Sequence, residues 1–229
     1  MKKIIIISLT LSLILGVGVV YAYKNLSQKA EGEVIELNNF NNEDFFEMGK
    51  QFSGNESNTN SEELSSSLKK LNINRYNALI VQFTKIDGLK IEDAKERAME
   101  GLILEVALTQ AALNRGIVVT DDEAKKTAQE FRNLLENPTE DTFGINNEAV
   151  NKFIEGLGIT EEEYWNEFAI DGYKQQLLQF KLRNDVINGI DPKNAEKVWE
   201  DFMENTINEY KKHHNIEIQE FKIEAGVNF

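Results

Sequence analysis

One segment of the sequence, residues 90–115, constrains the fold more than any other. It begins as an amphipathic pattern, with Ala94, Ala98 and Met99 on one face of a helix. Over residues 102–113, apolar side chains then recur on nearly every face. A helix that is apolar all round has to be covered on every side. The sequence therefore predicts a long helix at the centre of a domain.

Short local signals predict where the neighbouring helices begin and end. Gly116 can end the central helix in a left-handed conformation. Thr120 with Glu123, and Thr160 with Glu163, have the spacing of a capping box at a helix start. Asp191 before Pro192 predicts the start of a last helix, which ends at Lys211 and Lys212. The predicted helices between these signals cover residues 121–136, 148–155 and 160–186, with a polar loop over residues 137–147.

The two ends of the main domain, predicted over residues 61–229, are defined by apolar spacing. From Ser61 to Ile86, apolar residues recur at three- and four-residue steps, which predicts one helix that Gly88 ends. Near the C-terminus the apolar residues alternate in part, which predicts a short β-strand. That strand comprises Ile216, Ile218, Phe221 and Ile223. The fold class is accordingly all-α, an irregular multi-helix domain with a short C-terminal strand.

The first 22 residues have the pattern of an export signal. Lys2 and Lys3 precede an uncharged run over residues 4–20, and small residues lie before the end of the segment at Ala22. With three further residues the run is long enough to span a bilayer, so a cleaved signal peptide and a retained membrane anchor are both open. Either way the two lysines stay inside, and the rest of the chain is extracytoplasmic. It is then secreted, or anchored to the membrane only through the N-terminal segment.

Residues 23–60 are rich in Asn, Ser, Glu and Gln, which predicts a flexible polar linker. A short aromatic segment interrupts it, with Phe45 and Met48 near its middle. We expect this segment to form a short helix, capped by Asn42, that folds back onto the domain. A linear motif for a partner protein is the alternative.

The composition excludes several classes of function. The net charge is −14, which argues against nucleic acid and against an anionic membrane surface as partners. The chain contains no cysteine, which excludes disulfides, thiolate nucleophiles and cysteine–zinc sites. His213 and His214 are adjacent, so they do not share a helix face and do not predict a metal site. We therefore expect no catalytic residue, no cofactor and no metal, and the protein is not predicted to be an enzyme.

Residues 98–180 resemble the N-terminal chaperone domain of the SurA family, which is similar in outline to PrsA-type foldases and to the C-terminal domain of trigger factor. The resemblance rests on three segments: the apolar run and Gly-Ile break over residues 102–117, the cap over residues 119–123, and the cap over residues 157–165. The helix after Asp191 and the predicted strand resemble the segment that completes this domain from a distance in sequence. The resemblance thus implies two separate stretches that close into one helical body.

Two departures from the family change the implied activity. Family members usually carry parvulin prolyl-isomerase domains between the two stretches, and here only residues 183–191 join them. PrsA-type foldases are also anchored through a cysteine, which this chain lacks. The resemblance therefore implies a chaperone-like protein that binds unfolded or partly folded exported polypeptides without prolyl isomerase activity. The alternative is a cell-surface module that binds one dedicated partner or self-associates, for example as a homodimer.

Six aromatic side chains are candidates for a peptide-binding surface. Aromatic residues at helical spacing belong to the core in most cases, and we expect this for most of the six. A chaperone, however, needs some accessible apolar surface for its clients. The six candidates are Tyr76, Phe83, Tyr164, Trp165, Phe168 and Tyr173.

Overall fold

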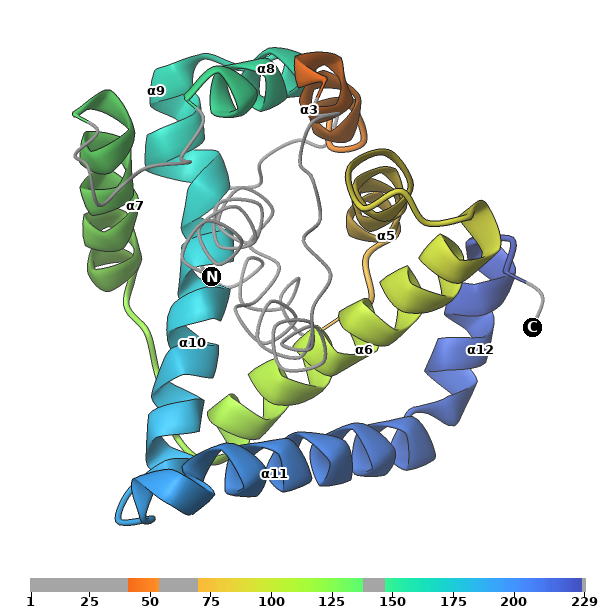
Figure 1. The fold of residues 1–229 in the computed structure, drawn as a ribbon, viewed down its shortest axis with the longest axis vertical. Helices are drawn as coiled ribbons and strands as arrows, with labels where there is room; N and C mark the ends of the chain where they lie inside the picture. The colour runs from red at the N-terminus through yellow and green to blue at the C-terminus, as the bar shows by residue number, and fades with distance from the viewer. Residues whose placement is uncertain (1–40, 54–69, 138–146, 228–229) are drawn as a thin grey trace.

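The computed structural model describes residues 41–53, 70–137 and 147–227, and within these ranges every regular element is a helix (Figure 1). The all-α class is therefore confirmed. The predicted export signal, most of the predicted linker and most of the polar loop before residue 147 lie outside the described residues. Residues 61–69, where the first long helix was expected to begin, lie outside them as well.

The predicted C-terminal strand is wrong, because this segment forms helix α12 (Asn215–Glu224). Ile218 and Phe221, three residues apart, are buried, whereas Ile216 and Ile223, seven residues apart, are 75% and 81% exposed. Both separations match the period of a helix rather than that of a strand. A short run of apolar residues is compatible with either period, so contacts in the folded molecule decide between them.

The predicted central helix is confirmed as α6 (Ile91–Asn114). All residues from 101 to 109 are buried, including Leu102 and Leu108. The helix ends where the sequence indicates, at Gly116, whose φ angle is +74°. The amide of Ile117 donates to the carbonyl of Ala112 across 3.0 Å, which closes the C-terminal turn.

Both predicted capping boxes are formed. Thr120 caps α7 (Asp121–Glu136), and Thr160 caps α9 (Glu161–Glu163). After α9 the chain continues through a π-helical turn, η3 (Tyr164–Phe168), into α10 (Ala169–Ile187). The predicted last helix is α11 (Pro192–His213), and the Asp191 side chain accepts from the Lys193 amide across 2.9 Å.

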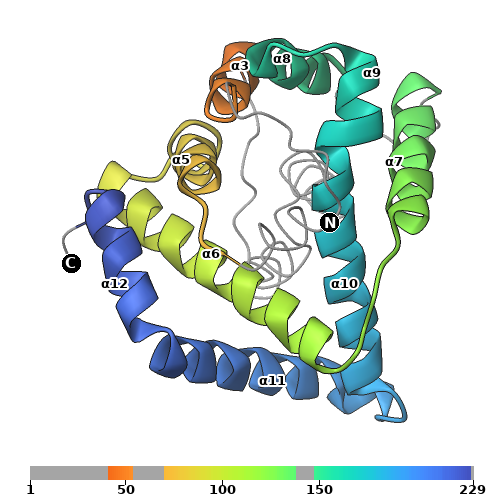
Figure 2. The same cartoon turned by 180° about the vertical axis from the view of Figure 1, so that it is seen from behind.

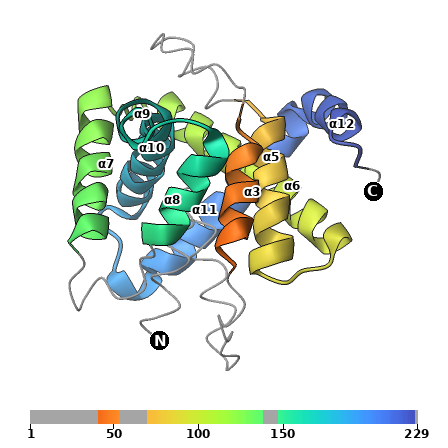
Figure 3. The ribbon, with the colours of Figure 1, turned by 90° about the horizontal axis from the view of Figure 1, so that it is seen from above.

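The aromatic segment near the N-terminus forms helix α3 (Asn42–Lys50) and folds back onto the body, as expected. Its N-cap is Asn41 rather than the predicted Asn42. Phe45 and Met48 are buried, and α3 lies between α8 (Asn147–Leu157) and α5 (Ile73–Val81) (Figure 3). The first hydrophobic core therefore includes side chains from residue 45 onward.

The helix predicted to run unbroken from Ser61 to Ile86 is wrong at residues 70–72, which are not helical. The Asn72 side chain instead accepts from the Arg75 amide across 3.0 Å and caps the start of α5. Asn, with a side chain that competes for backbone hydrogen bonds, favours a helix start over a helix interior. After α5 the chain continues as a π-helical segment, η1 (Gln82–Ile86).

Two glycines bring the backbones of α3 and α8 into direct contact. A Cβ atom added at Gly49 would collide with the carbonyl oxygen of Phe153. A Cβ atom added at Gly156 would collide with the carbonyl oxygen of Phe46. Only glycine therefore fits at these two positions, and the contact sets the distance between the two helices.

Three long helices, α6, α10 and α11, converge at one corner and form the frame of the molecule, with α6 running between the other two (Figure 1). Seen from behind, α12 follows α11 and lies beside the first turns of α6, while α7 lies outside α10 (Figure 2). A second core cluster fills the corner where the three helices converge, and there Trp199 of α11 packs with Leu104 of α6 and Leu178 of α10. The expected closure of the two distant stretches into one helical body is thus confirmed.

Candidate polar cavity and interhelical groove

The structure places five of the six aromatic candidates in the first hydrophobic core, each at most 2% exposed. These five are Tyr76, Phe83, Tyr164, Trp165 and Tyr173. Phe168 is partly buried and packs against the same core, with its ring stacked on that of Tyr164 at 5.8 Å between centroids. A peptide could reach most of these rings only if the helices separated.

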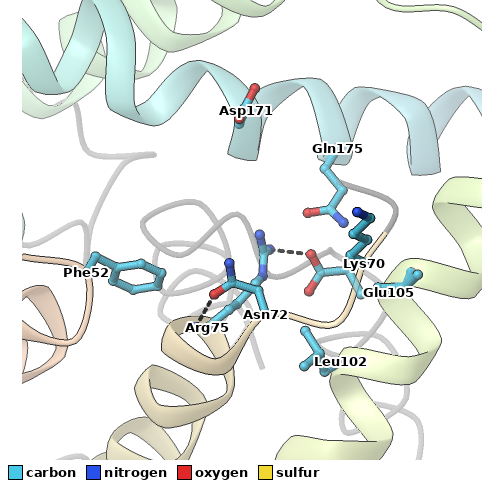
Figure 4. A pocket seen from close by; sticks show the side chains of 9 residues that line it. Phe52, Lys70, Asn72, Arg75, Leu102, Glu105, Asp171 and Gln175 are labelled. Atoms are coloured by element: carbon cyan, nitrogen blue, oxygen red, sulfur yellow. Dashed lines mark hydrogen bonds and ion pairs between the residues drawn. The ribbon is translucent and has the colours of Figure 1, made fainter. Parts of the chain in front are cut away.

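A small polar cavity of about 100 Å³ lies between α5, α6 and α10 (Figure 4). Three of its lining residues are apolar: Phe52, Leu102 and Val106. The rest of the lining is charged or amide-bearing, which is unusual next to a helix as apolar as α6. These polar residues are Lys70, Asn72, Arg75, Glu105, Asp171 and Gln175.

An ion pair between Arg75 and Glu105 crosses this cavity from α5 to α6, at 2.5 Å between Nη2 and Oε1 (Figure 4). The Glu105 side chain is only 4% exposed. Burial raises the pKa of Glu105 to about 7, although the positive charge of Arg75 acts in the opposite direction. The Gln175 amide also lies close enough to lower this pKa, while its hydrogen bond goes to Thr109.

The orientation of the buried Gln175 amide follows from its neighbours. The Thr109 hydroxyl donates to the carbonyl oxygen of Glu105 across 2.9 Å, which uses its single hydrogen. It can then only accept, and Nε2 of Gln175 donates to it across 3.2 Å. The Gln175 side chain is 1% exposed, and its Oε1 is left without a hydrogen bond among the described residues.

Three acceptor oxygens of the cavity lining lack a hydrogen bond among the described residues. Within the described part of the chain, Oε1 of Gln175, Oε2 of Glu105 and Oδ1 of Asp171 accept no hydrogen bond. Burial raises the pKa of Asp171 above its ordinary value, and the nearby Lys174 and Arg75 cations lower it in part. Buried polar atoms without a partner are uncommon in native proteins, so their gathering in one cavity marks it as a candidate site.

A second hollow, an interhelical groove of about 280 Å³, lies between α6 and the C-terminal helices. Its floor is apolar and consists of the buried Met99, Ile103 and Ile218. The α6 wall carries acidic side chains, and the opposite wall carries basic and amide side chains. These wall residues are Glu96 and Glu100 on α6, and Lys211, Asn215, Gln219 and Lys222 opposite.

The residues of the polar cavity are not among the candidate site residues predicted from the sequence. A signal was present at Glu105, since a carboxylate inside a helix that is apolar on all sides has to be paired when buried. Nothing local marked Arg75 as its partner, because the two residues lie on different helices. Asp171 and Gln175 are ordinary surface residues by type, and only the packing of α10 places them inside.

Within the described ranges, no group of three or more His, Cys, Asp or Glu side chains is arranged to hold a metal ion. Within the same ranges, no helix has the length and apolar character needed to cross a membrane.

Comparison with known proteins finds a relative of this chain. The glutamate-rich protein GrpA of Alkalihalophilus pseudofirmus is 34% identical over 140 residues, which make up 61% of this chain and 86% of GrpA. The name of GrpA describes its amino-acid composition. No protein-family model matches the chain. No solved structure matches it either.

Proposed function

The chain belongs to the same family as the glutamate-rich protein GrpA, and from the interhelical groove and the resemblance of residues 98–180 we propose that it is a chaperone-like protein. It binds unfolded or partly folded exported polypeptides, outside the cytoplasmic membrane, without prolyl isomerase activity. The proposal includes the finer fold assignment, a domain of the SurA N-terminal type. It also includes the export signal over residues 1–22.

The observation that carries this proposal is the interhelical groove between α6 and α12. Its apolar floor can receive an apolar side chain, and its charged walls keep the surface soluble between binding events. Two exposed apolar side chains of α12, Ile216 and Ile223, lie next to the groove residue Gln219 on the helix surface. A groove and an adjoining apolar stripe together suit weak binding of many sequences, because apolar contact imposes no hydrogen-bonding pattern.

The arrangement of the helices supports the finer fold assignment. The resemblance implies that a C-terminal segment returns to complete the domain, and α11 packs on α6 and α10 through Trp199. The two capping boxes that carry the resemblance are both formed.

The proposal is tested by the aggregation of a reduced, unfolded model protein at stoichiometric ratios. The full chain is expected to suppress aggregation, and the double variant Ile216→Ser with Ile223→Ser is expected to lose most of this effect. Both positions are exposed, so the variant should fold as the parent does. Light scattering measures aggregation, and circular dichroism with urea unfolding checks the fold.

The matched control is the double variant Val118→Ser with Phe180→Ser. Val118 lies just before α7 and is 67% exposed, and Phe180 lies on α10 and is 60% exposed. Both positions are far from α12. It is expected to suppress aggregation like the parent chain. No suppression by the parent chain would contradict the proposed function. If a pull-down instead shows one saturable partner and unrelated unfolded peptides do not bind, the surface-module alternative is correct.

A further inference from the structure

The interhelical groove carries opposite charges on its two walls. Glu96 and Glu100 lie on the α6 wall, and Lys211 and Lys222 lie on the wall opposite. The formal charges of these four residues cancel, although the net charge of the whole chain is −14. The net charge of the protein therefore does not describe what the groove attracts.

Three of the four wall charges are open to a ligand. Within the described ranges, Glu96, Glu100 and Lys211 form no ion pair, and all three are exposed. Elsewhere, opposite charges on neighbouring helices do pair, as Lys181 of α10 and Glu123 of α7 do at 2.7 Å. A bound segment can therefore pair with these three wall charges without breaking an ion pair between described residues.

The floor of the groove anchors a client without choosing among apolar residues. It consists of the buried Met99, Ile103 and Ile218. The flexible thioether of a methionine adapts to apolar side chains of different shapes. The volume of about 280 Å³ lies at the small end of ligand pockets, which measure roughly 300–1,000 Å³. The groove can therefore take one large apolar side chain, and any selection among clients falls to the walls.

The two walls discriminate between patterns of charge. A segment with the same charge on both sides of its apolar residue is attracted by one wall and repelled by the other, so the two effects largely cancel. A segment with a basic group on one side and an acidic group on the other is attracted by both walls. An uncharged segment binds through the floor alone.

We propose that the groove selects polypeptide segments in which one large apolar residue lies between a basic and an acidic residue. Either order of the two charges serves, since a segment can cross the groove in both directions. This inference rests on the proposed function, because it specifies which clients the groove binds.

Three nine-residue peptides with blocked ends test the selection on the full chain. Each has a central phenylalanine, with charged residues two positions before and after it. In an extended chain these side chains point the same way as the phenylalanine, roughly 7 Å from it. The mixed peptide carries lysine and glutamate, the basic peptide two lysines, and the acidic peptide two glutamates.

The mixed peptide is expected to bind about fivefold more tightly than either of the others at about 0.15 M NaCl. Isothermal titration calorimetry measures the three affinities. At about 1 M NaCl the screening length falls to about 3 Å, so the three affinities should converge.

The double variant Glu96→Gln with Glu100→Gln removes the charge of the α6 wall at exposed positions. It is expected to bind the mixed and acidic peptides alike, because only the basic wall still discriminates. The matched control, Glu200→Gln with Glu204→Gln, makes the same change at the same spacing on α11, at exposed positions outside the groove. The control should keep the fivefold preference, and circular dichroism with urea unfolding checks both folds. A preference retained without the α6 charges would overturn the inference.

The remaining outcomes separate this inference from the proposed function. Tightest binding of the basic peptide would mean that net charge selects clients, and equal binding of all three would mean that the floor alone binds. Either result overturns the inference and leaves the proposed function intact. A dimer in sedimentation equilibrium, with peptide affinity that falls as the chain concentration rises, would assign the groove to a second copy and overturn the inference as well. If no peptide binds and aggregation is not suppressed, both are wrong.

Discussion

A carboxyl group at position 105 lies inside a helix that is otherwise apolar, and one guanidinium offsets much of the cost of burying it. Ion pairs of this kind add little net stability, because desolvation opposes the attraction between the charges. Breaking them is costly, since a single buried charge remains. At the scale of the residue, the Arg75–Glu105 pair therefore ties α5 to α6 in one relative position more than it stabilises the fold.

The raised pKa of Glu105 predicts a pH dependence of stability. The pKa is about 7 in the folded protein and has its ordinary value of 4.5 in the unfolded chain, so the folded state holds the proton between these values. The contribution of Glu105 to the free energy of unfolding is therefore fully present below pH 4.5 and is lost as the pH rises through 7. The loss amounts to up to about 3 kcal/mol. Urea unfolding at pH 5 and at pH 7.5 measures this change in the free energy of unfolding.

Glu105→Gln is the control for this prediction, because glutamine does not titrate. The free energy of unfolding of the parent chain should fall between pH 5 and pH 7.5 relative to that of the variant. Parallel pH profiles of the two proteins would show that Glu105 titrates near its ordinary pKa.

At the scale of the element, local chemistry determined most helix boundaries. Gly116, Thr120, Thr160 and the Asp191-Pro192 pair act within a few residues of themselves, so their effects could be predicted from the sequence. The α12 segment could not, because its apolar spacing fits a helix and a strand until its neighbours are known. The polar cavity could not either, since it combines side chains from three helices.

The glycine contact between α3 and α8 gives the prediction at this scale. Gly156→Ala is expected to cost about 1–3 kcal/mol, because the new methyl group collides with the Phe46 carbonyl and separates the two backbones. Amide hydrogen exchange should then lose protection throughout α3. Gly158→Ala is the control: its φ is +74° and nothing lies within 4 Å of the added atom, so it strains its own turn and leaves α3 protected. Retained protection of α3 in Gly156→Ala would contradict the close contact.

At the scale of the whole molecule, the frame depends on the return of α11 to helices that precede it in the chain. Trp199 is 1% exposed and lies in the second core cluster with side chains of α6 and α10. The return of this segment was predictable only through the family resemblance, because periodicity alone shows that α11 has an apolar face and not what covers it.

Trp199→Ala is expected to destabilise the protein by about 3–5 kcal/mol, as the loss of a large buried side chain leaves a cavity at the corner of the frame. Urea unfolding followed by circular dichroism measures the change. Phe180→Ala removes an aromatic ring that is 60% exposed and should change stability by no more than about 0.5 kcal/mol. A similar small effect of both substitutions would mean that α11 contributes little to the frame.

The pairing of α3 with α8 has a consequence for biosynthesis. Ribosomes make the chain from its N-terminus at about 5–20 residues per second, so α3 emerges on the order of ten seconds before α8 exists. During that interval Phe45 and Met48, which are buried in the finished protein, have no α8 to cover them. The apolar face of α3 therefore stays without its α8 cover until synthesis has passed Leu157.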